Sequence, residues 1–222
     1  MRLLLIEDEP SLNFRLSQSL EAAGFAVDTA YDGEEGWYLG DTEPYDAVIL
    51  DLGLPKLDGN SVLARWREAG RTMPVLVLTA RGRWSEKMVA FNAGADDYVT
   101  KPFELDEVVY RVRALIRRAS GHAQPELVCG GLRMDTNGGR VSMDGMPVQL
   151  TAQEFRILSY LMHHQGKVVS RTELMEHVYD RNFDNDSNVL EVLIGRLRKK
   201  LGGGLIHTIR GQGYRLDLAA ES

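Results

Sequence analysis

The sequence lacks the features that define several large classes of protein. Its single cysteine, Cys129, excludes an intramolecular disulfide and a zinc cluster of cysteines, which suits a reducing cytoplasm. The apolar run Leu3–Ile6 ends after four residues at Glu7, and no other run approaches the length of a bilayer, so we expect neither a signal peptide nor a membrane partner. No glycine-rich phosphate loop follows a strand pattern, which argues against a nucleotide-binding domain.

What is present is typical of a soluble globular protein, since 44% of the 222 residues are hydrophobic and 26% are charged. A chain of this length favours two domains over one. The net charge of −6 comes from residues 1–120, which hold 20 acidic and 14 basic side chains, whereas the rest of the chain is balanced. Within residues 187–216, six basic side chains accompany one acidic side chain, Glu191, and form a local basic patch.

The first half alternates short apolar runs with amphipathic segments. This alternation predicts a parallel sheet with helices on both faces, a doubly wound α/β fold. The expected strands are residues 3–6, 26–30, 47–50, 75–78 and 97–100. The expected helices are residues 11–23, 34–39, 61–69, 86–93 and 105–118. We therefore expect a (βα)5 domain with a parallel five-stranded sheet over residues 1–118.

The second half has a different pattern. Residues 119–125 are small and polar and are expected to be a linker. Residues 126–149 combine short β segments with two hairpin signals, at 137–139 and 144–145, which predicts a small antiparallel sheet. Thr151 and Ser170 each precede a glutamate by three residues, the capping-box signature of a helix start. Residues 126–222 are thus expected to form a small α+β domain.

The longest helix pattern of this half runs from Ser187 to Leu201. Its expected apolar stripe is Val189, Val192, Leu193 and Leu197. A basic helix is more often a solvated surface than a DNA contact, but two shorter helices precede this one and a hairpin with Arg210 at its turn follows. That order predicts a winged helix-turn-helix, with one helix in the major groove and the hairpin against the backbone or minor groove.

Three acidic residues follow strands of the predicted parallel sheet. Glu7 and Asp8 come after the first strand, and Asp51 ends the third. Ligands bind at the carboxyl ends of such strands, so we expect the three carboxylates to meet there. Like charges in close proximity raise each other's pKa, and a cation offsets that cost. Mg²⁺ prefers oxygen ligands of this kind and is the expected cofactor.

A hydroxyl and an ammonium group arrive at the same edge of the sheet. Thr79 ends the fourth strand, and Lys101 follows the fifth, before Pro102. Carboxylates alone would indicate only a metal site, but acids combined with a lysine and a threonine can hold a phosphoryl group. Asp51, central among them, is then the expected acceptor nucleophile. Pro102 is expected to fix the loop, with a cis bond as one option.

The motifs IEDE, DLGLPKLDG, TA and GADDYVTKPF resemble the receiver domain of two-component response regulators, over residues 1 to about 118. The resemblance implies an aspartyl phosphate at Asp51, with a sensor histidine kinase or a small acyl phosphate as donor. It implies Mg²⁺ bound by Glu7, Asp8, Asp51 and the backbone carbonyl of Gly53. It further implies that Thr79 and Lys101 contact the phosphoryl group, and that Thr79 and Tyr98 form the conformational switch. The resemblance also implies a transcription factor, not an enzyme, whose receiver promotes its own phosphorylation and dephosphorylation.

A mixed-charge surface is expected on the fourth helix, fifth strand and fifth helix of this domain. Its candidate residues are Lys87, Asp96, Asp97, Glu107, Arg111 and Arg113. Surfaces with both signs are often only solvated, but they also suit a two-fold interface. The resemblance to the OmpR/PhoB type of response regulator implies that phosphorylation produces a homodimer through this face, with pairs such as Lys87 with Glu107 and Asp97 with Arg111.

The motifs LTAQEFRILSYL, RLRKKL and IRGQGYRL resemble the OmpR/PhoB effector domain, over residues 126 to about 218. By position, the resemblance implies base or phosphate contacts from Arg196 and Arg198, and phosphate contacts from Asn188 and Lys199. Arg210 is the expected minor-groove residue. Leu193 departs from the pattern, in which histidine or tyrosine is frequent, and this departure argues against a DNA contact there.

Two other functions are weighed against these residues. A haloacid-dehalogenase phosphatase would also use a strand-end aspartate and Mg²⁺, but it needs a second aspartate where this chain has Gly53. A DNA-binding protein with a phosphate-independent dimerisation domain remains an alternative, although all five pocket groups are present. We expect a cytoplasmic transcription factor that binds promoter DNA with two half-sites when phosphorylated, with RNA polymerase as a further partner.

Overall fold

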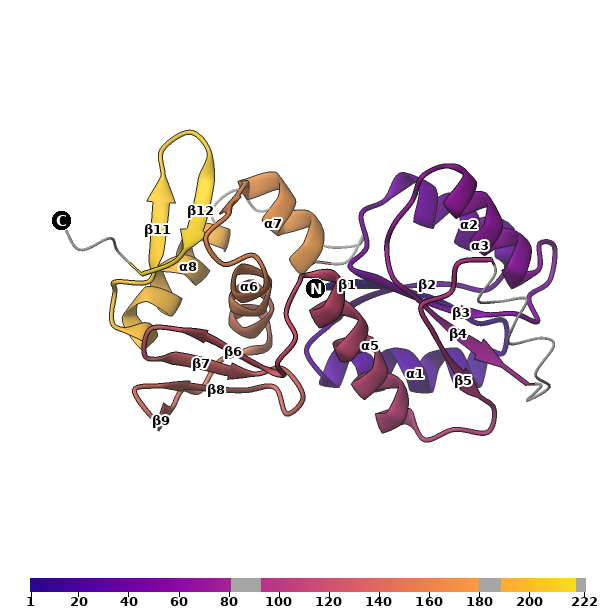
Figure 1. The fold of residues 1–222 in the computed structure, drawn as a ribbon, viewed down its shortest axis with the longest axis horizontal. Helices are drawn as coiled ribbons and strands as arrows, with labels where there is room; N and C mark the ends of the chain where they lie inside the picture. Colours follow the sequence, from indigo (N-terminus) through magenta and orange to yellow (C-terminus); the bar gives the residue numbers. More distant parts are fainter. Residues whose placement is uncertain (81–92, 180–188, 219–222) are drawn as a thin grey trace. The chain divides into compact units, whose positions relative to one another are not determined.

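A computed structural model describes residues 1–80, 93–179 and 189–218. The chain divides into two compact units, Arg2–Ala119 and Ser120–Ser222, drawn in Figure 1. Lys87, Asn188 and nearly all of the predicted helix 86–93 lie outside the described residues. Within these residues, no helix is both long enough and apolar enough to span a membrane.

The first unit contains all five predicted strands in one parallel sheet. They are β1 (Arg2–Ile6), β2 (Ala26–Ala30), β3 (Ala47–Asp51), β4 (Val75–Thr79) and β5 (Asp97–Thr100), in the order β2-β1-β3-β4-β5. Every residue of β1, β3 and β4 is buried. Their unbroken apolar sequences are therefore explained by a sheet that is covered on both faces.

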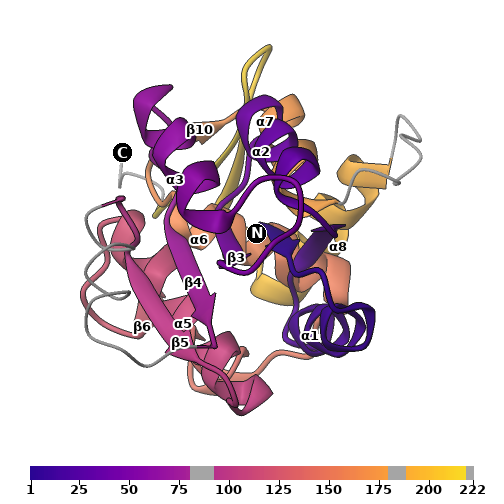
Figure 2. The same cartoon turned by 90° about the vertical axis from the view of Figure 1, so that its right-hand side faces the viewer.

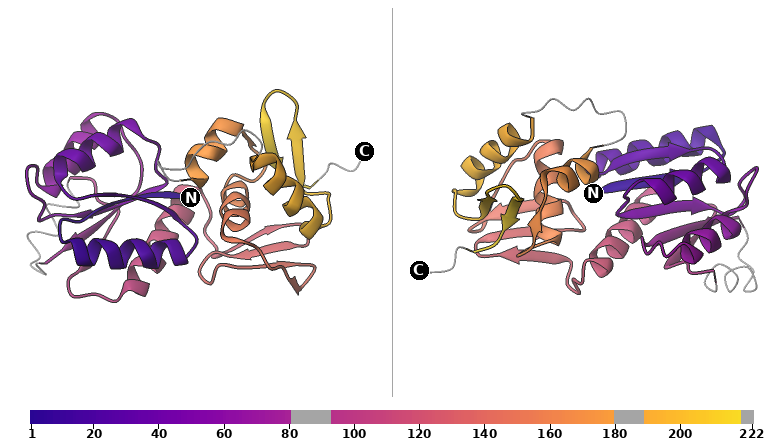
Figure 3. Two further views of the ribbon diagram at one scale, coloured as in Figure 1. Left: turned by 180° about the vertical axis from the view of Figure 1, so that it is seen from behind. Right: turned by 90° about the horizontal axis from the view of Figure 1, so that it is seen from above.

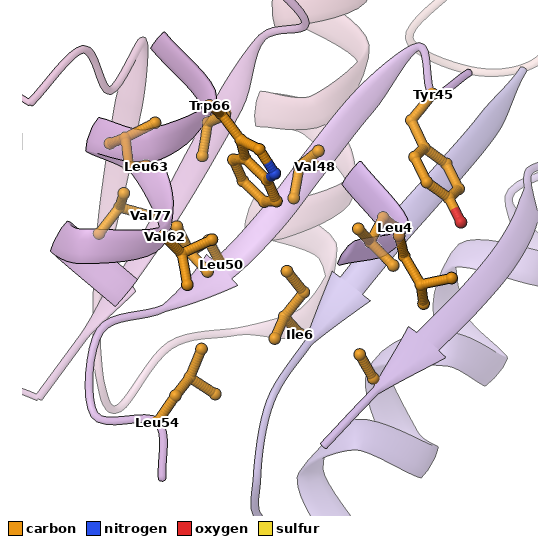
Figure 4. Close-up of a cluster of buried hydrophobic side chains, with 13 residues drawn as sticks. Leu4, Ile6, Tyr45, Val48, Leu50, Leu54, Val62, Leu63, Trp66 and Val77 are labelled. Atoms are coloured by element: carbon orange, nitrogen blue, oxygen red, sulfur yellow. The ribbon is translucent and has the colours of Figure 1, made fainter. Parts of the chain in front are cut away.

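Four described helices cover this sheet: α1 (Pro10–Ala22), α2 (Gly33–Thr42), α3 (Gly59–Glu68) and α5 (Leu105–Ala119). Figure 1 and Figure 2 show α2 and α3 on one face of the sheet and α1 and α5 on the other. Side chains alternate between the faces along a strand. Leu4 and Ile6 of β1 accordingly pack with Trp66 of α3 in the core beneath α2 and α3 (Figure 4). The doubly wound α/β prediction is confirmed.

Glycines allow close packing within this unit. A Cβ at Gly40 of α2 would lie 2.4 Å from the ring of Trp66, and one at Gly36 would lie 2.6 Å from Ile6. A Cβ at Gly59, the first residue of α3, would lie 2.3 Å from the carbonyl oxygen of Asp51. A side chain at these positions would force its neighbours to shift, so glycine lets α2 pack closely against α3 and β1, and lets α3 begin close to the end of β3.

The second unit begins with the predicted antiparallel sheet, formed by β6 (Glu126–Cys129), β7 (Leu132–Asp135), β8 (Arg140–Met143) and β9 (Met146–Pro147). The turn between β8 and β9 has positive φ at both Asp144 and Gly145, as a two-residue hairpin requires. Three helices follow: α6 (Ala152–His163), α7 (Arg171–Val178) and α8 (Val189–Leu201). Both predicted capping boxes are present.

The wing of this unit contains one strand that the sequence pattern did not reveal. The predicted hairpin is formed by β11 (Ile206–Ile209) and β12 (Gly213–Leu216), and the two-residue strand β10 (Val168–Val169) pairs with β12. The hairpin of β11 and β12, drawn in yellow, lies beside α8 in both views of Figure 3. A Cβ at Gly213 would lie 2.0 Å from the carbonyl oxygen of Val169, so glycine permits this pairing. The winged-helix prediction is confirmed.

One part of the predicted apolar stripe of α8 is wrong. The helix buries Leu190, Leu193, Ile194, Leu197 and Leu201. Val192 is instead 50% exposed. The buried residues recur at spacings of three and four, which places position 192 on the opposite side of the helix from this stripe.

Candidate functional site

The carboxyl ends of β1 and β3 bring three acidic side chains together. Ligand atoms of Glu7, Asp8 and Asp51 all lie within 4.8 Å of one another. These two strands are neighbours in the sheet, with Ile6 paired to Leu50. Glu7 and Asp51 are 1% and 6% exposed, while Asp8 is open to solvent. Two buried carboxylates beside a third exposed one form a pocket that can hold a cation.

Lys101 joins the two buried acids. Its Nζ lies 2.7 Å from Oε2 of Glu7 and 3.2 Å from Oδ2 of Asp51. Burial raises the pKa of Glu7 and the charge of Asp51 raises it further, although the hydrogen bond from Lys101 acts in the opposite direction. Burial alone would lower the pKa of Lys101, but its bond to Glu7 and the charge of Asp51 outweigh burial and raise it. The ammonium group is therefore held charged between the two acids.

The end of each strand is fixed by backbone contacts. The backbone N–H of Lys101 donates to the carbonyl of Thr79 at 2.8 Å, and the bond from Lys101 to Pro102 is cis. Oδ1 of Asp51 accepts from the backbone N–H of Leu52 at 2.9 Å. Thr79 is buried at the end of β4. The structure thus places Thr79, Lys101 and Asp51 at one edge of the sheet, as the sequence predicts.

Gly53 and Tyr98, two further predicted residues, have defined positions. A Cβ at Gly53 would lie 3.6 Å from Oδ2 of Asp51, so position 53 borders the carboxylate of Asp51. Tyr98, on β5, is half-buried and packs against the core cluster beneath α2 and α3.

Asn13 was not predicted from the sequence. Its buried amide donates to the carbonyl of Glu7 at 2.9 Å and to that of Ala30 at 3.3 Å, which fixes the end of β1 against β2.

The residues predicted for the dimer surface have different bonding partners in the structure. Nη1 of Arg111 lies 2.9 Å from Asp97, and its Nη2 lies 2.7 Å from Glu107, so these three residues form one network. Asp96 and Arg113 do not join this network. Asp96 accepts from Arg67 of α3 and from the backbone N–H of Val75. Arg113 donates to the carbonyl of Ala23, next to the end of α1. The place of Asp96 and Arg113 in a dimer surface stays a prediction.

The candidate DNA-binding residues occupy two different environments in the second unit. Arg196 and Lys199 are exposed on α8, and Arg210 is exposed at the turn of the wing. Arg198 is oriented toward the wing, where its Nε donates to the carbonyl of Ile206 at 2.9 Å and its Nη2 to Thr208 at 2.7 Å. Arg198 therefore holds α8 and β11 together.

Two ion pairs that the sequence did not reveal fix α8 against the other helices. Lys200 lies 2.7 Å from the buried carboxylate of Glu154 in α6. Arg171, the first residue of α7, pairs with Glu191 in the first turn of α8. The exposed cations of α8 are thus presented on a helix whose orientation is set by contacts on its other sides.

Comparison with known families agrees with the division of the chain into two units. The family model for the response regulator receiver domain matches residues 3–113, and the model for the C-terminal domain of transcriptional regulatory proteins matches residues 145–216. The chain belongs to the OmpR/PhoB family of two-component response regulators. It is a phosphorylation-dependent, DNA-binding transcriptional regulator that acts with a kinase partner, rather than an enzyme.

Two curated relatives match over nearly the full length of the chain, and a solved receiver domain matches its first half. The two-component response regulator PhoP of Pseudomonas aeruginosa is 44% identical over 218 residues, which cover 96% of this chain and 97% of PhoP. The transcriptional regulatory protein PhoP of Escherichia coli K12 is 42% identical over 223 residues, covering 98% of this chain and all of that protein. The receiver domain of Francisella response regulator 1452 is 33% identical, with a TM-score of 0.52, and covers 53% of this chain and 98% of that domain.

Proposed function

We propose that Asp51 is the phosphoacceptor and that a sensor histidine kinase donates the phosphoryl group from a phosphohistidine. The observation that carries this proposal is the Lys101 ammonium group between Glu7 and Asp51, at 2.7 and 3.2 Å, at the carboxyl edge of the sheet. A carboxylate oxygen of Asp51 forms the bond to phosphorus as the phosphorus–nitrogen bond breaks. The imidazole nitrogen keeps the electron pair of that bond and takes a proton from solvent.

Lys101 and Thr79 stabilise the transferred group. The ammonium group of Lys101 donates to a phosphoryl oxygen, and the hydroxyl of Thr79 donates to a second one. Attack by water at phosphorus later restores the Asp51 carboxylate, so the same pocket promotes both the gain and the loss of the phosphoryl group. Tyr98 moves inward when Thr79 moves toward the phosphoryl group, and this coupled movement transmits the signal to the surface.

The donor set of the pocket fits Mg²⁺. Glu7, Asp8 and Asp51 would supply carboxylate oxygens, and the backbone carbonyl of Gly53 would supply a fourth ligand. When bound, Mg²⁺ neutralises part of this charge and polarises the phosphoryl oxygens. The raised pKa of Glu7 supports this assignment, because it reflects buried negative charge that a cation would stabilise.

Mass spectrometry after incubation with a small acyl phosphate and Mg²⁺ tests the acceptor. We expect one phosphoryl adduct on the wild-type chain and none on the Asp51→Asn variant. Asp41→Asn is a matched control, because Asp41 pairs with Arg71 away from the pocket and its loss should leave the adduct unchanged. A phosphate-independent dimerisation domain, the alternative function, would show no adduct on any of the three chains.

We further propose that phosphorylation produces a homodimer through the surface formed by Asp97, Glu107 and Arg111. The described part of this surface carries both signs of charge, which suits a two-fold interface. Lys87 is proposed to complete it. Analytical ultracentrifugation of the phosphorylated chain should show a dimer, and Arg111→Ala should weaken it. A monomer at all concentrations in the phosphorylated state would contradict this model.

The dimer is proposed to bind two tandem half-sites in promoter DNA, where it contacts RNA polymerase. Arg196, Lys199 and Arg210 are exposed cations on α8 and on the wing, and Asn188 is proposed to add a phosphate contact. Half-sites about 10 to 11 base pairs apart would place both α8 helices on one side of the duplex. Binding to such tandem sites that is no tighter than binding to a single half-site would contradict the assembly.

A further inference from the structure

Asn13 is a polar residue on the buried side of α1, next to the carboxyl ends of β1 and β2. Its side chain is enclosed, since the residue is only 1% exposed. Its Nδ2 donates to the carbonyl oxygen of Glu7 at 2.9 Å and to that of Ala30 at 3.3 Å. The oxygen of Ala30 also accepts from the backbone N–H of Glu7 at 3.2 Å. One amide group therefore joins α1 to the residue that follows β1 and to the last residue of β2.

Stability alone does not account for an asparagine at this position. Among the residues that the structure describes, Oδ1 of Asn13 has no hydrogen-bond partner. A buried acceptor without a partner destabilises a fold, and asparagine favours a helix less than leucine does. What asparagine supplies here, and an apolar residue would not, is the N–H donor to the carbonyls of Glu7 and Ala30.

The carbonyl of Glu7 belongs to the peptide group that leads into Asp8. The side chains of Glu7 and Asp51 are both held by the ammonium group of Lys101. Asp8 is exposed and has no comparable contact within the described part of the chain. The direction of the Asp8 carboxylate therefore depends on its backbone, and the amide of Asn13 fixes the orientation of the peptide group before it.

The direction of one carboxylate matters more for Mg²⁺ than for Ca²⁺. Mg²⁺ requires a nearly ideal octahedron with ligands at about 2.0 to 2.1 Å, whereas Ca²⁺ accepts flexible geometry at about 2.3 to 2.6 Å. Groups that orient a ligand from behind also affect affinity, and their loss typically weakens metal binding about 10- to 100-fold. Releasing the peptide group before Asp8 should thus weaken Mg²⁺ binding more than Ca²⁺ binding.

We propose that Asn13 is a positioning residue that sets the preference of the pocket formed by Glu7, Asp8 and Asp51 for Mg²⁺ over Ca²⁺. Its amide holds the carbonyl of Glu7, and this contact keeps the carboxylate of Asp8 directed toward the other two acids, within the 4.8 Å that the three ligand atoms span. This inference rests on the proposed function, because it requires the three acids to be metal ligands.

The test is isothermal titration calorimetry of the full chain with magnesium chloride and with calcium chloride. Asn13→Leu keeps the branched shape of the side chain but removes the amide donor. Its Mg²⁺ affinity should fall about tenfold or more, and its Ca²⁺ affinity should fall less, so the ratio of the two affinities should decrease. An equal fall in both affinities, or no fall in either, would overturn the inference.

Two further variants keep this comparison interpretable. Ser17→Ala is the matched control, because Ser17 is a buried polar residue of α1 whose hydroxyl donates to the carbonyl of Phe14. Its two affinities should equal those of the wild type. Circular dichroism without metal checks the folding of each chain. If Asn13→Leu does not fold, Asn13→Ala removes the same donor without added bulk and should show the same decrease in the ratio.

Asp8→Asn separates failure of this inference from failure of the proposed function. If Asp8→Asn weakens Mg²⁺ binding while a folded Asn13→Leu binds both cations as the wild type does, the metal site is right and the positioning role of Asn13 is wrong. If Asp8→Asn leaves the Mg²⁺ affinity unchanged, Asp8 is not a metal ligand, and both the inference and the proposed metal site are wrong.

Discussion

A buried ion pair at the amino end of β1 supports a quantitative prediction about stability. Nη2 and Nε of Arg2 lie 2.7 and 2.8 Å from Oδ2 of Asp28, and the two side chains are 4% and 3% exposed. The hydroxyl of Tyr45 donates to the same carboxylate at 2.9 Å. Arg2→Met would leave the buried Asp28 charge without this cation, and such a loss costs about 3 to 5 kcal/mol. That is a large part of the ~5 to 15 kcal/mol that stabilises a typical domain.

The assay is urea unfolding of the full chain, followed by tryptophan fluorescence. All three tryptophans of the protein, at positions 37, 66 and 84, lie in the first unit, so the signal reports its unfolding alone. Arg71→Met is the matched control, because Arg71 and Asp41 form a pair at 2.9 Å with side chains 47% and 32% exposed. Exposed pairs contribute only about 0.2 to 1 kcal/mol.

The double variant Arg2→Met/Asp28→Leu completes the test. Removing both charges should recover most of the lost stability, since a well-packed apolar pair often matches a buried ion pair. Phosphorylation of Asp51 should persist in the folded fraction, because Arg2 and the acidic pocket lie at opposite ends of β1. Equal losses for Arg2→Met and Arg71→Met would refute the reasoning, because burial would then make no difference to the energy of the pair.

Three further predictions concern charge. Burial acts to raise the pKa of Glu154, but the hydrogen bonds that Glu154 accepts from Lys200 and from the Thr151 N–H outweigh burial and lower this pKa. The stability that ionised Glu154 contributes is therefore present above about pH 4.3, and it is lost as the pH falls through the lower pKa of the folded state. Glu154→Gln should make the stability of the second unit, measured by circular dichroism, depend less on pH in the acid range. An unchanged dependence on pH would count against the Glu154–Lys200 pair. Lys101→Met should abolish phosphorylation. Added Mg²⁺ should raise the melting temperature of this variant more than that of the wild type, because Glu7 and Asp51 lose the ammonium group that neutralises them. A smaller rise than in the wild type would be inconsistent with Lys101 and Mg²⁺ binding the same acids. Arg210→Ala should reduce the slope of log affinity against log salt by about 0.9 if it contacts one phosphate, and an unchanged slope would exclude that contact.

Local signals predicted the helix starts of the second unit well. Thr151 with Glu154, and Ser170 with Glu173, form capping boxes at the expected positions, because a cap depends on residues within one turn. The strand β10 was missed, since two residues carry no periodicity and its pairing with β12 is a tertiary contact. Gly213 was the available signal, but a glycine does not identify the strand that approaches it.

Side-chain partners were predicted less well than positions. The order of strand ends predicted that Glu7, Asp51 and Lys101 would share one edge, but not that the ammonium group would lie closer to Glu7. Val192 and Leu193 are adjacent apolar residues, and a stripe that includes both does not reveal which one the helix buries. Arg113 was assigned by its element alone, and its actual partner is a carbonyl 90 positions earlier in the chain.

The contacts of Arg111 within one chain determine what dimer formation can gain from charge. Its guanidinium group already bonds to Asp97 and Glu107 of its own chain. If a partner's carboxylate replaces one of these two acids, association becomes an exchange of ion pairs with nearly balanced electrostatic energy. Added salt would then screen both sides of the exchange alike. Such a dimer should tolerate changes in ionic strength that sharply weaken its hold on DNA.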